Sequence, residues 1–144
     1  MTAERSAAAS YDDFALTPGT RDIRWRMRLA EPPSRVYGFL ATDAGRVRWW
    51  SDRSEERDGL VHLQFLGEQD LIVPVLRAQA PVHYSLRYLD GSELHFNLRA
   101  TDGGGTDFDF TARGLTAERW RDHHASWLGA LLRLKAICDA SSKC

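Results

Sequence analysis

Two adjacent histidines, His123 and His124, are the residues of this sequence whose types suit acid–base or metal chemistry. They open the segment HHASWLGALLRLKAICD, which spans residues 123–139. Neighbouring side chains on a helix point about 100° apart, whereas two histidines that share a metal ion need a spacing such as i, i+4. We therefore predict no metal site and no cofactor. His124 could still carry a proton, since imidazole titrates near neutral pH, but packing against Trp120 or Trp127 is the simpler interpretation.

The element that carries these histidines is an amphipathic helix predicted from Trp120 to Cys138, with Thr116 as its N-cap. At about 100° per residue, one stripe of the helix is apolar and contains Trp120, Trp127, Leu131, Leu134 and Cys138. His124 lies closer to the centre of that stripe than His123. A helix of this length extends about 27 Å, which is enough to cross a whole sheet.

A pair of strands is predicted from charge alternation at the two ends of the folded region. Residues 23–29, IRWRMRL, alternate apolar and basic side chains, and residues 106–114, TDFDFTARG, include alternating aromatic and acidic ones. If the two strands pair, the arginines of the first meet the acids of the second on the outer face. These residues are Arg24, Arg26, Arg28, Asp107 and Asp109. We expect this face to be a solvated, acid-paired surface and not a nucleic-acid site.

Between these strands the sequence predicts two short helices and a run of antiparallel hairpins. Pro32 and Pro33 end the first strand and start a helix within EPPSRVYGFLATD, and Asp43 can cap a second helix, AGRVRWW. A charged link, SDRSEERDG, follows. Strand character then recurs over residues 60–67, 70–79, 82–89 and 92–100, with turn residues between them. Pro74 suggests an edge or a bulge in the second of these strands.

The order of these elements resembles the SRPBCC (START-like, Bet v 1-like) superfamily. The residues that carry the resemblance are RLAEPPSRVYGFLATD…WW near the start, GGGTDFDFTARGL late, and W…SWLGALLRLK at the end. The activator-of-Hsp90-ATPase homologue branch is the most similar, and the resemblance covers residues 21–140. It implies an α+β helix-grip (Bet v 1-like) fold, in which an antiparallel sheet of six or seven strands wraps around the long C-terminal helix. It also implies a hydrophobic cavity between sheet and helix.

Inward-facing residues of such a sheet are candidates for the walls of that cavity. Alternation along the strands, together with the helices, selects Trp50, Leu63, Phe65, Tyr84, Leu86, Tyr88, Phe96, Leu98, Phe108, Trp120, His124 and Trp127. Tyr84 and Tyr88 stand out, because a buried phenol needs a hydrogen-bond partner and could orient a ligand. The alternative for each residue is an ordinary core contact. His62, His83 and His95 fall on the outward face.

Composition favours a single cytoplasmic domain over residues 21–144, preceded by a flexible arm over residues 1–20. The chain has 144 residues and a net charge of −1, a balance that predicts neither nucleic-acid nor membrane-surface binding. The cysteines, Cys138 and Cys144, form no disulfide framework, which suits a reducing compartment. The N-terminus shows no signal-peptide pattern, and no apolar run is long enough to span a membrane.

Three functions are compatible with these patterns. The leading one is binding of a small hydrophobic or aromatic molecule, with lipids among the candidates, in the implied cavity. The second is an enzyme of the cyclase, aromatase or hydrolase type; because motifs such as GxSxG and HExxH are absent, no catalytic residue is assigned. The third is an Hsp90-activator-like protein-interaction domain, which an exposed apolar patch at Trp49 and Trp50 would favour. The sequence leaves a monomer and a homodimer open.

Overall fold

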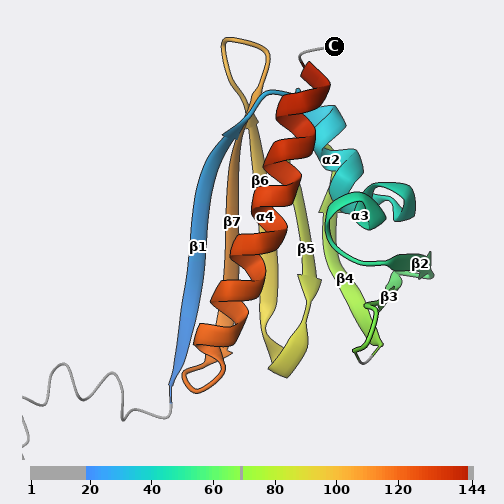
Figure 1. The fold of residues 1–144 in the computed structure, drawn as a ribbon, viewed down its shortest axis with the longest axis vertical. Coiled ribbons are helices and arrows are strands. Elements are labelled where there is room, and N and C mark those ends of the chain that lie inside the picture. The colour runs from blue at the N-terminus through green and yellow to red at the C-terminus, as the bar shows by residue number, and fades with distance from the viewer. Residues whose placement is uncertain (1–18, 69, 143–144) are drawn as a thin grey trace, which may run out of the picture.

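The C-terminal helix lies across one face of an antiparallel sheet (Figure 1). The computed structural model describes residues 19–68 and 70–142, so most of the predicted arm and Cys144 lie outside the described residues. In chain order the elements are β1 (Thr20–Leu29), α2 (Pro33–Ala41), α3 (Asp43–Trp49), β2 (Arg53–Arg57), β3 (Leu60–Gln64), β4 (Leu71–Gln79), β5 (His83–Arg87), the 3₁₀ turn η1 (Leu89–Gly91), β6 (Glu93–Ala100), β7 (Thr106–Thr116) and α4 (Trp120–Ser142). The seven strands are ordered β1-β7-β6-β5-β4-β3-β2. The predicted α+β helix-grip fold is confirmed.

The pairing of β1 with β7 has the register predicted from charge alternation. Arg26 lies opposite Asp109 and Arg28 lies opposite Asp107. Asp109 accepts hydrogen bonds from Arg24 at 3.0 Å and from Arg26 at 3.1 Å, and Asp107 accepts one from Arg28 at 3.2 Å. Each of these exposed ion pairs contributes under about 1 kcal/mol. A shift by one residue would turn the aromatic side chains outward, so the alternation specifies the register.

One strand was missed because its composition is polar. The segment predicted as a charged link contains β2, which pairs with β3 through Glu55–His62 and Glu56–Val61. Asp58 and Gly59 form the turn between the two strands, both with positive φ (51° and 80°), as a two-residue hairpin turn requires. Charged side chains are common on an edge strand, where they discourage pairing with other chains, and here they obscure the alternation.

Two predicted helix caps are wrong. The N-cap of α3 is Thr42, whose hydroxyl accepts a hydrogen bond from the Gly45 amide at 3.0 Å, and Asp43 is the first helical residue. Thr116 ends β7 opposite Thr20, and α4 begins only at Trp120. A threonine suits a strand as well as a cap, so its type alone does not decide the position of the boundary.

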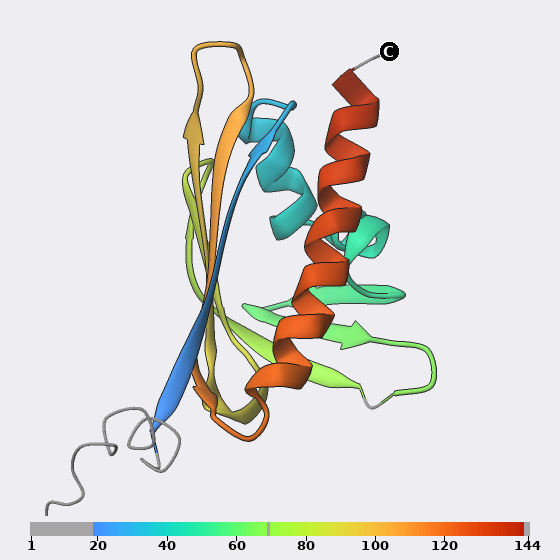
Figure 2. The same ribbon diagram turned by 60° about the vertical axis from the view of Figure 1, so that its left-hand side comes forward.

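Strand β4 bends where Pro74 suggested a bulge. Its first half, residues 71–74, pairs with β3, and its second half pairs with β5. The register shifts between Val75 and Arg77. The β2–β3 hairpin therefore lies on the side of α4 opposite β1, and Figure 2 shows the sheet curling around the helix. Among the described residues, no helix is long and apolar enough to cross a membrane.

Candidate functional site

The space between the sheet and the middle of α4 is filled by aromatic side chains. The Phe110 ring lies 4.7 Å from the Trp127 ring and 5.2 Å from the Phe96 ring, and Phe96 also contacts Phe108 at 5.9 Å. Eight of the residues predicted to contact a ligand belong to this packed core: Trp50, Leu63, Tyr84, Leu86, Phe96, Leu98, Phe108 and Trp127. The cavity that the family resemblance implied is closed at this level of the fold.

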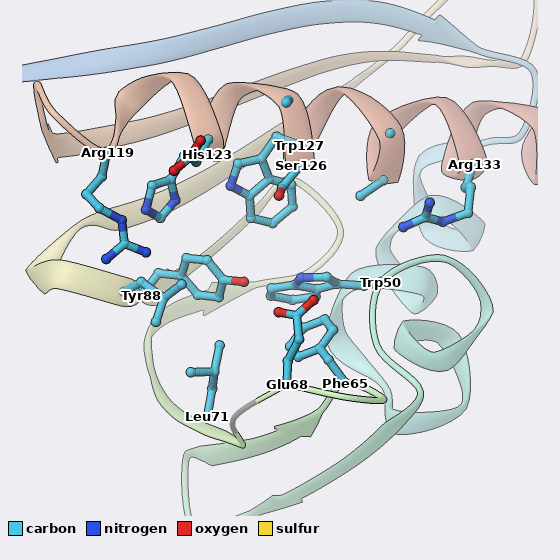
Figure 3. A pocket seen from close by; sticks show the side chains of 15 residues that line it. Trp50, Phe65, Glu68, Leu71, Tyr88, Arg119, His123, Ser126, Trp127 and Arg133 are labelled. Atoms are coloured by element: carbon cyan, nitrogen blue, oxygen red, sulfur yellow. The ribbon is translucent and has the colours of Figure 1, made fainter.

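A cleft of about 580 Å³ remains beside α4, between the first half of the helix, the turn from β3 to β4 and the turn after β5 (Figure 3). This volume falls within the usual range for small-molecule sites. The lining residues are Trp50, Phe65, Glu68, Leu71, Tyr88, Leu89, Arg119, Asp122, His123, Ala125, Ser126, Trp127, Gly129, Ala130 and Arg133. Of the predicted ligand contacts, the structure brings Trp50, Phe65, Tyr88 and Trp127 together here.

Three aromatic rings form a continuous wall of the cleft. The Trp50 and Trp127 rings lie 5.5 Å apart, Tyr88 and Trp127 lie 5.6 Å apart, and Trp50 and Tyr88 lie 5.8 Å apart. Trp49 stacks behind Trp50 at 5.5 Å, so the wall continues into the core. Because the rings touch one another, no ligand fits between them. An occupant of the cleft would meet only the small parts of Trp50 and Trp127 that remain exposed, 7 % and 3 % of these residues.

Burial sets the chemistry of Tyr88. It raises the pKa of the phenol to about 12, although the hydrogen bond from the Trp50 indole N–H acts in the opposite direction. At neutral pH Tyr88 is therefore an uncharged hydrogen-bonding group. In Figure 3 its hydroxyl points along the wall toward Trp50.

Charged side chains surround the aromatic wall. Glu68 and Asp122 contribute two negative charges, and Arg119 and Arg133 contribute two positive ones. The Arg133 Nε donates a hydrogen bond to the Trp49 carbonyl at 3.1 Å, which holds the guanidinium beside the Trp50 ring in Figure 3. These opposite charges balance, so electrostatics favour neither a strongly anionic nor a strongly cationic ligand.

The histidine that lines the cleft is His123, not His124. His123 is 6 % exposed, and its Nε2 has no hydrogen-bond partner among the described residues. That nitrogen lies 3.5 Å from Asp90 Oδ2, and Arg119 Nη1 lies 3.7 Å from the same oxygen. Sequence reasoning selected His124 instead of His123 because His124 lies closer to the centre of the predicted apolar stripe.

His124 and Trp120 occupy the side of α4 that faces β1. The His124 ring lies 4.9 Å from Trp120 and 5.4 Å from Trp25, which is the packing interpretation considered from the sequence. The Trp120 indole donates a hydrogen bond to the Asp22 carbonyl at 3.1 Å. These contacts hold the start of α4 on β1 and turn His123 toward the cleft.

Tyr84 points to a buried arginine and away from the cleft. The Tyr84 hydroxyl accepts a hydrogen bond from Arg46 at 2.6 Å, and burial raises the pKa of this phenol to about 12. The Arg46 side chain is fully buried and also donates to the Leu40 carbonyl, Asp43, Ser54 and Glu56. Sequence reasoning missed Arg46 because nothing in an arginine-rich chain distinguishes a buried arginine from a solvated one.

The structure does not bring together a site for either of the two other predicted functions. No catalytic residue was assigned to an enzyme, and of the polar residues among the predicted ligand contacts, Tyr84, Tyr88 and His124, only Tyr88 lines the cleft. An exposed apolar patch at Trp49 and Trp50 would have favoured a protein-interaction domain, but these residues are 2 % and 7 % exposed. Among the described residues, no group of three His, Cys, Asp or Glu side chains is arranged to hold a metal ion.

Comparison with known proteins finds similarity in structure alone. No protein-family model matches the chain, and no curated protein matches it in sequence. The Aha1 dimer from Colwellia psychrerythraea is 20 % identical, with a TM-score of 0.74 over 83 % of this chain and 96 % of that chain. A protein from Bacillus halodurans is 20 % identical, with a TM-score of 0.71 over 85 % and 99 % of the two chains.

A third solved structure, CalU16 from Micromonospora echinospora, is 22 % identical, with a TM-score of 0.63 over 80 % of this chain and 74 % of that chain. At these identities the likeness concerns the fold and not the activity. The resemblance predicted from the sequence is thus confirmed at that level: the chain has the helix-grip fold that it shares with Aha1 and its structural relatives.

Proposed function

We propose that this protein binds a small, flat aromatic molecule in the cleft beside α4. The observation that carries the proposal is the continuous wall of Trp50, Tyr88 and Trp127 at the edge of a cleft of about 580 Å³. Burial of apolar surface contributes about 25 cal/mol per Å², and contact between aromatic rings adds about 0.5 to 1.5 kcal/mol. A planar ligand gains most from such a wall.

Glycine in α4 provides a way to fill the cleft without disturbing its walls. A Cβ atom added at Gly129 would meet only the Arg133 Nη1 atom, at 3.8 Å. Gly129→Leu therefore places a side chain in the cleft, and it favours the helix, because leucine has the higher helix propensity. Ala136 is exposed on the same helix and does not line the cleft, so Ala136→Leu is the matched control.

Thermal unfolding in the presence of a library of neutral aromatic compounds tests the proposal. A ligand present at about 100 times its dissociation constant stabilises the folded state by about 2.7 kcal/mol. We expect such compounds to raise the melting temperature of the native protein and of Ala136→Leu, and not that of Gly129→Leu. The proposal fails if no compound stabilises the native protein, or if Gly129→Leu responds equally.

The outer face of α4 favours a second candidate function, self-association. Leu128 and Leu132 are 37 % and 56 % exposed and lie one turn apart on this helix. The Colwellia neighbour is described as a dimer. We propose a homodimer that buries these two leucines. Analytical ultracentrifugation should show a dimer for the native chain and a monomer for Leu132→Glu; a native monomer at high concentration contradicts it.

A further inference from the structure

We propose that His123 and Asp90 bind a hydroxyl group, so that the preferred ligand is an aromatic molecule with a neutral hydroxyl. This inference rests on the proposed function, because it assigns a polar anchor to the same cleft. It distinguishes phenols from three compounds with the same ring system: the bare hydrocarbon, the carboxylic acid and the amine.

The Nε2 atom of His123 is buried without a hydrogen-bond partner among the described residues. Buried polar atoms in folded proteins almost always have hydrogen-bond partners, and one without a partner costs stability. His123 Nε2 has none among the described residues, although Asp90 Oδ2 lies only 3.5 Å away. A bound polar atom would satisfy the nitrogen and offset that cost.

The position of His123 on α4 places it beside the aromatic wall. His123 precedes Trp127 by four residues on α4, so the two side chains lie on the same face, one turn apart. Figure 3 shows His123 and Arg119 at one end of the aromatic wall and Arg133 at the other. A ring that lies against Trp127 therefore brings a substituent on its edge toward His123.

Access to the nitrogen depends on an exposed arginine. Arg119 approaches the same Asp90 oxygen as His123, at 3.7 Å, and its side chain is 51 % exposed. The two donors converge on one acceptor at separations longer than a good hydrogen bond. A rotation of the Arg119 side chain into solvent would open this position to a ligand group without any change in the backbone.

The donors and acceptors of His123 and Asp90 determine which ligand group fits between them. A hydroxyl both accepts and donates, so it can accept from the His123 N–H and donate to the Asp90 carboxylate. A ligand carboxylate at this position would lie beside the negative Asp90, next to the cleft, and the lining residues Asp122 and Glu68 offset the positive charges of Arg119 and Arg133. A ligand ammonium could donate to Asp90 but, unlike a hydroxyl, could not accept from the His123 N–H. The neutral hydroxyl is the group that satisfies both partners.

Binding of four matched compounds tests the inference. Isothermal titration calorimetry would compare 2-naphthol with naphthalene, 2-naphthoate and 2-naphthylmethylamine. Because hydrogen bonds to charged groups are among the stronger ones, we expect 2-naphthol to bind about tenfold more tightly than naphthalene. We expect the carboxylate and the amine to bind no more tightly than naphthalene.

Two variants remove the anchor independently. Asp90→Asn removes the charge and suits the backbone, because Asp90 has a φ of 59° and asparagine tolerates that region. His123→Phe removes both ring nitrogens and keeps an aromatic ring. Each should reduce the tenfold preference for 2-naphthol to about twofold or less, while naphthalene still binds. His124→Gln, which lies outside the cleft, should keep the full preference.

The outcomes separate this inference from the proposed function. If naphthalene and 2-naphthol bind equally to the native protein, the hydroxyl anchor is wrong and the aromatic cleft stands. If the preference persists in both Asp90→Asn and His123→Phe, the anchor is wrong as assigned. A preference for the amine or the carboxylate would also overturn it. If no compound binds, the proposed function itself fails.

Discussion

The two sides of α4 meet very different surroundings. On the side of β1, β7 and β6, rings and aliphatic side chains fill the space, with Phe96, Phe108 and Phe110 at most 1 % exposed. On the side of the β3–β4 turn, an open cleft of about 580 Å³ separates the helix from the strands. The same helix thus closes a core with one face and borders an open cleft with another.

The bend in β4 accounts for the difference. The strands from β5 to β1 form a regular antiparallel sheet with long ladders. On the other side of the register shift at Val75, residues 71–74 of β4 pair with β3, and the buried Arg46 donates to Ser54 and Glu56 of β2. A helix-grip sheet can therefore be filled by side chains at its centre and still leave a cleft at its edge.

Truncation of one phenylalanine on each side of α4 should give the largest difference in the free energy of unfolding. Phe108 is 1 % exposed in the packed interior, whereas Phe65 is only partly buried in the cleft. We expect Phe108→Ala to lower the free energy of unfolding by about 3 to 5 kcal/mol, and Phe65→Ala by about 1 kcal/mol. Urea denaturation measures both. Equal losses would show that the two regions do not differ in packing.

Arg46 should hold the open side together. Arg46→Leu removes the donors to Asp43, Ser54, Glu56 and Tyr84, but the two carboxylates are partly exposed, so water replaces some of what is lost. We expect a loss of about 3 kcal/mol in the free energy of unfolding, at the low end for a broken buried ion pair.

The control for this variant is Arg48→Leu on the same helix. Arg48 is exposed and lies over the Phe39 ring at 5.5 Å, a contact that contributes up to about 1 kcal/mol. The buried and exposed arginines should therefore differ clearly in denaturation. If Arg46→Leu lowers the free energy of unfolding no more than Arg48→Leu does, Arg46 does not hold this side of the protein together.

The smallest effect is expected on the outer face of the regular sheet. Burial alone would raise the pKa of Asp109, but hydrogen bonds and positive charge from Arg24 and Arg26 outweigh it and lower that pKa. A lowered folded-state pKa gives stability that is present above the unfolded-state pKa of about 3.9 and is lost as the pH falls through the folded value. Because these groups are partly exposed, the gain is under about 1 kcal/mol.

Asp109→Asn should therefore be less stable than the native protein near pH 6, and the difference should shrink as the pH falls below about 3.9 and through the lowered folded-state pKa of Asp109. Urea denaturation at several pH values provides the measurement. Asp102→Asn, in the exposed turn between β6 and β7, serves as the control and should show no such trend. If the difference in the free energy of unfolding instead grows as the pH falls, the lowered pKa of Asp109 does not stabilise the folded state.

The sequence predicted the regular half of the sheet well, because its signals are local. Alternation from Ile23 to Leu29 and from Thr106 onward determines both the strands and their register. It predicted β2 poorly, since an exposed edge strand leaves no apolar alternation to detect. Pro74 correctly indicated the bulge in β4. A proline in the sequence does not show, however, how far β2 and β3 turn away from the rest of the sheet.

The candidate site was predicted only in part, for a related reason. Trp50, Phe65, Tyr88 and Trp127 were expected to meet a ligand, and they line the cleft. His123 was passed over for His124 because the rotation of α4 about its axis depends on contacts of Trp120 with β1, which no helical periodicity encodes. Whether a cavity is open or filled depends on the summed volume of distant aromatic side chains.

The most direct test of the ligand cleft uses the five tryptophans as reporters. Trp50 and Trp127 form its wall, whereas Trp25 and Trp120 pack with His124 on the other side of α4. Two-dimensional ¹H–¹⁵N spectra resolve each indole N–H signal during titration with 2-naphthol. The account predicts that the Trp50 and Trp127 signals move together and saturate while those of Trp25 and Trp120 stay in place. Movement of Trp25 and Trp120 alone, or of no indole signal, would contradict it.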